Sequence, residues 1–273
     1  MESKNMNTEQ QIPERSQPQM SIWQKMVNMI TVPENVYSRL KDGVTLQDWL
    51  VPFLIAVLFT GISGMVNAPE TLQLTKQAIQ QQQDNFADRD MSDEQRQNMT
   101  QRFEESIEKQ ERRYTPPQVY YWSIGRAGVG MALAILVLAA IYHFSGNTFL
   151  GAESTFLKIL AVVCLAQAVT VVSAGYDILY SMATGPGSAP SSLAVLLPFG
   201  PGEIFSVERY QQALFSLLSQ IDLFTIWRLV LYGIGFRIIY SVSKAKAYGV
   251  VFGFYVFWLF VTTAASYLFA GLQ

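Results

Sequence analysis

Four charged residues stand inside or beside long apolar segments of this sequence, where charge is rare: Arg126, Asp177, Asp222 and Arg228. A charge at the centre of a bilayer costs about 2.5–3.5 kcal/mol on insertion scales, so such residues pair, reach the interface or line a polar path. We expect the two arginines to pair with the two aspartates across neighbouring helices. Two uses of this charge cluster stay open: a path for a polar substrate or ion, and a clamp that fixes helix register.

Sequence patterns of enzymes and metal centres are missing. The run GRAGVG at Gly125–Gly130 lacks the lysine of a phosphate-binding loop, and no HExxH motif or nucleophile elbow occurs. Cys164 is the only cysteine, which excludes CxxC and Cys/His zinc spacings. A net charge of -2 gives no basic footprint for nucleic acid. We therefore expect no catalytic residue, cofactor or metal, and no nucleic-acid partner.

The elements that would position the four charges are long apolar runs. Only 15% of the residues are charged, against about 25% in soluble domains. A helix crosses the hydrocarbon core of a bilayer with about 20 residues. The expected spans are residues 47–67, 117–143, 156–180, 223–243 and 247–270. The sequence thus predicts an all-α, polytopic membrane protein with five transmembrane helices in a domain over residues 47–273.

Three polar or amphipathic segments accompany the spans. Residues 1–20 are polar and are expected to form a disordered tail. Residues 21–46 have helical apolar spacing, which predicts a juxtamembrane amphipathic helix interrupted at Pro33. Residues 68–116 are rich in Gln and Glu and predict a polar helical hairpin between the first and second spans, with a capping box starting at Ser92.

Small residues recur at four-residue spacing at the start of the last span: Ala245, Gly249 and Gly253. Such a face lets two helices approach closely, either inside one chain or between two copies.

The charge distribution predicts an orientation. Five spans place the termini on opposite sides, and the loops on the side of the N-terminus carry a net charge of +2 against −4 for the rest. The positive-inside tendency favours a cytoplasmic N-terminus, an extracytoplasmic C-terminus and an extracytoplasmic hairpin.

The run LLSQIDLFTIWRLVLYGIGF resembles a sequence pattern of the bacterial branch of the Yip1 family. The residues that carry the likeness are Asp222, Leu223, Phe224, Trp227, Leu231 and Gly235. The run MVNMITVPENVYSRL and the polar insert after the first span fit the same family. The resemblance implies a five-span helical domain with a cytoplasmic N-terminus in the bacterial inner membrane. It implies no catalytic residues, and the Rab contacts of eukaryotic relatives are not carried over.

Two functions follow as hypotheses. The first is a non-enzymatic integral membrane protein that organises or assists a membrane-protein partner, or a second copy of itself, in the lipid bilayer. The alternative is a small permease or ion-conducting subunit that uses the Arg/Asp cluster. A transporter should contain a polar cavity that reaches the bilayer midplane, often beside broken helices, whereas a scaffold should be a dry, packed bundle.

Overall fold

The computed structural model describes residues 20–87, 92–185 and 221–270, so the predicted tail lies almost wholly outside the described residues. All regular structure among these residues is helical, as predicted. Five helical segments are long and apolar enough to cross a membrane. They are α3 (Leu46–Val66), α6 (Gln118–Phe149), α7 with α8 (Phe156–Leu165 and Ala168–Thr184), α11 (Leu223–Tyr240) and α12 (Lys244–Ala270).

The second span is longer than the sequence predicted. Helix α6 continues to Phe149 rather than ending near residue 143. The reason is a contact with the fourth span: the Tyr240 ring lies against Gly146, and its hydroxyl donates a hydrogen bond to the His143 carbonyl at 3.2 Å. A side chain at position 146 would occupy the space of that ring, so glycine serves close packing here rather than a turn.

The third span is broken in its middle. At Gln167 the backbone tightens, because its N–H donates to the Cys164 carbonyl at 3.0 Å and the N–H of Val169 donates to the Ala166 carbonyl at 3.2 Å. These bonds reach back three residues instead of four, which is the spacing of a 3₁₀ turn. The Gln167 amide also donates to the Val163 carbonyl at 3.3 Å. A polar side chain therefore stabilises an interruption inside an apolar span.

The juxtamembrane segment forms two helices, α1 (Ile22–Thr31) and α2 (Pro33–Leu40), which confirms the break at Pro33. Helix α2 belongs to the bundle, since its Val36, Tyr37 and Leu40 are buried in the core. Its apolar residues gather on one side although the segment is polar on average.

Helix α1 docks on the bundle through Met26 and Met29 and leaves Trp23 and Val27 exposed by 65% and 63%. An exposed tryptophan one turn from an exposed valine is typical of a helix face that meets a membrane interface.

A buried ion pair joins α1 to the first span. Lys25 contacts the carboxylate of Asp48, and the Asp48 side chain is only 1% exposed. The same carboxylate accepts hydrogen bonds of 2.9 Å from the backbone N–H and the hydroxyl of Thr45, so it also caps α3. This arrangement satisfies a buried charge with a cation and two polar hydrogens.

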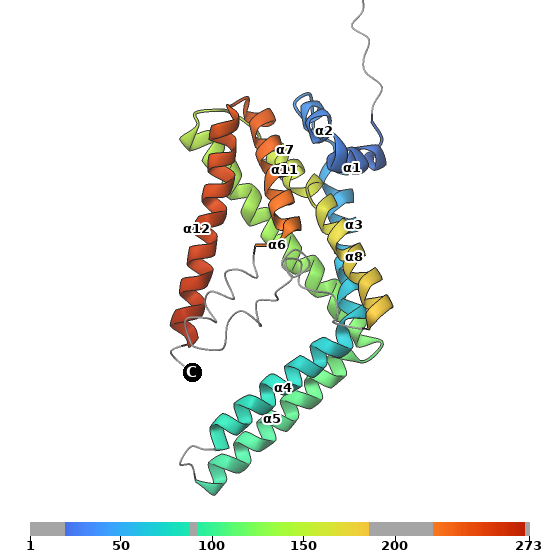
Figure 1. Ribbon diagram of the computed structural model, residues 1–273, viewed down its shortest axis with the longest axis vertical. Helices are drawn as coiled ribbons and strands as arrows, with labels where there is room; N and C mark the ends of the chain where they lie inside the picture. The colour runs from blue at the N-terminus through green and yellow to red at the C-terminus, as the bar shows by residue number, and fades with distance from the viewer. Residues whose placement is uncertain (1–19, 88–91, 186–220, 271–273) are drawn as a thin grey trace, which may run out of the picture.

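The polar insert is a helical hairpin, as predicted. Helices α4 (Ala68–Ala87) and α5 (Asp93–Tyr114) lie side by side and extend away from the bundle (Figure 1). Ser92 forms the expected capping box with Gln95. Lys76 on α4 pairs with Glu111 on α5, and no residue of α5 is buried.

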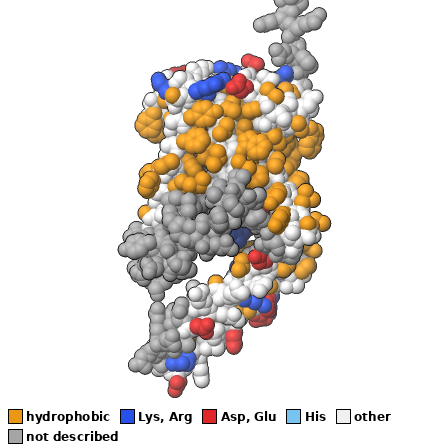
Figure 2. Space-filling model, in the orientation of Figure 1, with side chains coloured by type: hydrophobic (Ala, Val, Ile, Leu, Met, Phe, Trp, Pro, Cys, Tyr) orange, Lys and Arg blue, Asp and Glu red, His pale blue; other side chains and the backbone are white. Residues whose placement is uncertain are grey.

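Basic residues gather at the opposite end of the bundle, which we call the α1–α2 end. Lys41 donates to the Ser241 hydroxyl at 2.9 Å, and Lys158 donates to the Lys41 carbonyl at 2.7 Å. Arg237 pairs with Glu34 at 3.3 Å. Figure 2 shows Lys and Arg side chains at this end, above a broad belt of hydrophobic side chains.

Candidate functional site

A cavity of about 920 Å³ lies among the spans. Its walls come from α3, α6, α8, α11 and α12, from the break in the third span, and from Thr71 of α4 and Tyr114 of α5 at the base of the hairpin. Both arginines of the predicted charge cluster, Arg126 and Arg228, line it, whereas Asp177 and Asp222 do not. The cavity lining thus contains the two cations of the cluster but neither of its anions.

The expected ion pairs do not form. Among the residues that the structure describes, no salt bridge joins either arginine to either aspartate. Asp222 instead caps α11, where its carboxylate accepts from the backbone N–H and the hydroxyl of Thr225 at 2.7 Å each. The observed role of Asp222 among the described residues is therefore to cap α11.

Arg228 faces the cavity with hydroxyl partners. Its guanidinium donates to the Thr170 hydroxyl at 3.3 Å and to the Thr225 hydroxyl at 3.4 Å. These neutral contacts lie at the long end of the hydrogen-bond range. The Thr225 hydroxyl also donates to the Asp222 carboxylate, so among the described residues Arg228 reaches an anion only through this hydroxyl. Arg126 is exposed and makes no hydrogen bond or ion pair to a described residue, and Asp177 is half-buried with none either.

The two arginines lie at a similar depth in the bundle. Arg228 is 13 residues from Ser241 at the α1–α2 end, or about 20 Å along the helix. Gly61 is 15 residues from Leu46, or about 22 Å from the same end. Ile124, two residues before Arg126, packs against Gly61. Since the hydrocarbon core is about 30 Å thick, both arginines belong to the half nearer the hairpin.

Further polar side chains form one wall of the cavity. The Gln167 amide donates to the Tyr232 hydroxyl at 3.2 Å, and the Thr170 hydroxyl donates to the Gln167 carbonyl oxygen at 2.8 Å. Tyr142 meets Tyr232 and Phe254 edge-to-face, with ring centroids 5.7 and 6.3 Å apart. This polar wall was not predicted from the sequence. The pattern that could have indicated it is the single glutamine, Gln167, within an apolar span.

The family-like residues have structural roles in this bundle. Asp222 caps α11, Leu231 is buried, and Phe224 and Trp227 pack against the core, whereas Leu223 is exposed. Gly235 permits the closest approach, because a Cβ there would lie 2.5 Å from Val162 and 3.0 Å from the Tyr37 ring. The motif thus seats α11 against α2 and the third span.

The small-residue face of the last span is unoccupied within the described part of the chain. Ala245, Gly249 and Gly253 are exposed, and nothing lies within 4 Å of a Cβ built on either glycine. The described residues do not use this face for packing inside the chain, and both packing inside the chain and pairing between two copies stay predictions.

Groups of three or more His, Cys, Asp or Glu side chains able to hold a metal are absent from the described residues. The site offers arginine and hydroxyl donors within largely apolar walls. Such walls bind anions or amphiphiles rather than metals.

A bundle of five apolar spans around a cavity defines the class: a multi-pass, α-helical integral membrane protein. The family model of the Yip1 domain matches residues 27–266. The chain therefore belongs to the Yip1 family. The search of curated proteins and that of solved structures each found no match.

Proposed function

We propose that this protein is a non-enzymatic, permease-type membrane protein that admits a polar or charged small molecule into the cavity. The observation that carries the proposal is the cavity itself, which holds two arginines beside the break in the third span. Substrate sites of many secondary transporters lie near the midplane beside interrupted helices. An arginine inside the membrane without a direct ion pair to a described residue favours a ligand or ion path.

Cysteine accessibility tests whether the cavity contains water. The only natural thiol is the buried Cys164, so Cys164→Ala provides a silent background. In that background, Ala127→Cys places a thiol in the cavity wall, and Val129→Cys places one on the same helix outside it. Val129 is 66% exposed when no bilayer is present, so it is the matched lipid-facing control.

We expect a membrane-impermeant thiol reagent to label Ala127→Cys from the hairpin side and to leave Val129→Cys unlabelled in membranes. If neither variant is labelled, the bundle contains no accessible water and the permease proposal is wrong.

The projecting hairpin favours a second function, the assembly of a membrane-protein partner. Its helix α5 buries no residue, and the Lys76–Glu111 ion pair holds it to α4. A polar helix pair of this length offers a surface outside the bilayer. Crosslinking in native membranes through introduced cysteines on α5 tests this function, and recovery of only uncrosslinked protein would count against it.

We also propose that the α1–α2 end faces the cytoplasm and that the host membrane is the bacterial inner membrane. Lys41, Lys158 and Arg237 gather at this end, together with Lys244 and Lys246. Lys and Arg near span ends are retained on the cytoplasmic side.

A further inference from the structure

The cavity is positively charged. Its lining contains Arg126 and Arg228 and no Asp or Glu among the described residues. An arginine is always protonated in proteins, so the site carries two full charges inside the membrane. The Asp222 carboxylate reaches Arg228 only through the Thr225 hydroxyl, so an anion in the cavity would meet the field of two guanidinium groups.

The donors of this site are largely unused. A guanidinium has five N–H groups, and Arg228 gives two weak bonds to threonine hydroxyls, while Arg126 gives none to a described residue. The hydroxyl of Thr60, which also lines the cavity, is buried and has no partner among the described residues. Phosphate oxygens are the acceptors that two arginine forks match best.

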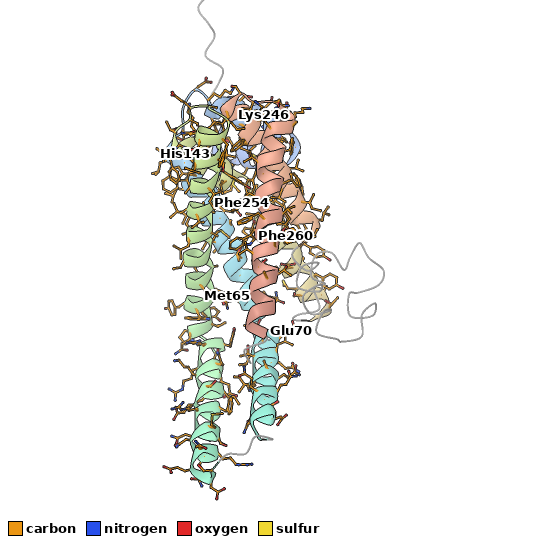
Figure 3. All side chains as sticks on the ribbon, turned by 90° about the vertical axis from the view of Figure 1, so that its left-hand side faces the viewer. Met65, Glu70, His143, Lys246, Phe254 and Phe260 are labelled. Carbon is orange, nitrogen blue, oxygen red and sulfur yellow. The ribbon has the colours of Figure 1, made fainter. Side chains whose placement is uncertain are left out.

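The remaining walls are apolar. Met131, Leu138, Phe254 and Trp258 line the cavity from α6 and α12. These two helices pack mainly on other partners, α6 on α3 and α12 on α11, so the cavity separates them along much of their length. Figure 3 shows α6 and α12 as two separate helices and labels Phe254 on α12. Such walls match a hydrocarbon chain, which a small inorganic anion does not have.

We infer that the cavity binds an anionic phospholipid, with its phosphate between Arg126 and Arg228 and an acyl chain along the wall formed by α6 and α12. This inference rests on the proposed function, because it names the ligand of the same cavity. The depth of the arginines places the phosphate roughly 10 Å inside the hairpin-side surface of the hydrocarbon core. A headgroup at that depth is drawn below the level of its neighbours in the leaflet.

Native mass spectrometry of the full chain tests the inference, with phosphatidylglycerol and phosphatidylcholine of identical chains as the two lipids. The variants are Arg126→Gln and Arg228→Gln. Arg237→Gln is the matched control, since Arg237 lies on the same helix as Arg228, nine residues further on, and outside the cavity. Because Arg126 is exposed, its replacement does not disturb the core, which keeps the test valid if Arg228→Gln folds poorly.

We expect one phosphatidylglycerol to be retained in preference to phosphatidylcholine. Each cavity variant should weaken its binding by about tenfold or more, as loss of a charge-assisted hydrogen bond does, and Arg237→Gln should stay within about twofold. Equal retention of both lipids, or an equal loss in Arg237→Gln, would overturn the inference.

The two proposals fail in distinguishable ways. If Ala127→Cys is labelled and phosphatidylglycerol is not retained, the cavity takes a soluble ligand and only the lipid inference is wrong. Protection of Ala127→Cys by inorganic phosphate, without retention of phosphatidylglycerol, would identify that ligand as a soluble phosphate. If phosphatidylglycerol is not retained and Ala127→Cys is also unlabelled, both proposals are wrong.

Discussion

Breaking the buried ion pair between Lys25 and Asp48 should destabilise the bundle by an amount that depends on which partner is removed. Loss of one member of a buried pair costs about 3–5 kcal/mol, because the other charge is left without its counter-ion. Lys25→Met leaves the Asp48 carboxylate, which is 1% exposed, and we expect the upper end of that range. Asp48→Asn leaves Lys25, which is 16% exposed and can reach water, so we expect about 3 kcal/mol.

The double variant Lys25→Met/Asp48→Asn separates the ion pair from the helix cap. The amide oxygen introduced at position 48 can still accept from the Thr45 N–H, and no buried charge is stranded. We therefore expect a loss of at most about 2 kcal/mol, far below the roughly 8 kcal/mol that additive single effects would give. The free energy of unfolding can be measured by titration with a denaturing detergent while a thiol-reactive dye reports exposure of the buried Cys164. Additive losses in the double variant would refute the reasoning.

Replacing two glycines of the last two spans by alanine should change the free energy of unfolding in opposite directions in the same assay. Gly235→Ala forces a Cβ to 2.5 Å from Val162 and should cost about 1–3 kcal/mol, whereas Gly249→Ala meets nothing within 4 Å and should gain up to about 1 kcal/mol of helix propensity. Burial raises the pKa of the Tyr37 phenol well above its usual value, so the folded protein retains the phenolic proton. The contribution of Tyr37 to the free energy of unfolding is therefore intact below about pH 10 and is lost at higher pH. Tyr37→Phe should remove that pH-dependent loss of stability. It should also cost about 1 kcal/mol, because the hydrogen bond to the Val162 carbonyl is lost. If both proteins lose the same stability above about pH 10, the prediction is wrong.

The five spans could be predicted because the signal is local. Uncharged apolar runs of about 20 residues require helices in a bilayer, and the capping boxes at Thr45 and Ser92 mark helix starts in the sequence itself. The position of each charge along its helix could be predicted for the same reason. The break at Gln167 could not, because neither proline nor glycine marks it and its stabilising bond to Tyr232 joins residues 65 positions apart.

The partners of the charges could not be predicted either, since depth along a helix does not define the direction in which a side chain points. Arg126, Arg228 and the two aspartates were expected to meet because their depths are similar. The rotation of each helix about its axis, which depends on contacts such as Gly235 with Tyr37 and Gly61 with Ile124, turns the arginines into the cavity and leaves Asp177 and Asp222 outside it. The burial of α2 escaped prediction for a similar reason, because its pocket is built by distant helices.

The hairpin is joined to the bundle by short connections to α3 and α6. One residue, Asn67, separates the end of α3 from the start of α4. The Asn67 side chain accepts a hydrogen bond of 2.9 Å from the Ser181 hydroxyl on α8. Helix α5 leads through two prolines into α6. With 20 residues, α4 is a lever about 30 Å long, so each degree of tilt moves its tip by about 0.5 Å. A tilt of the hairpin would therefore act on α3 and α6, which form two walls of the cavity.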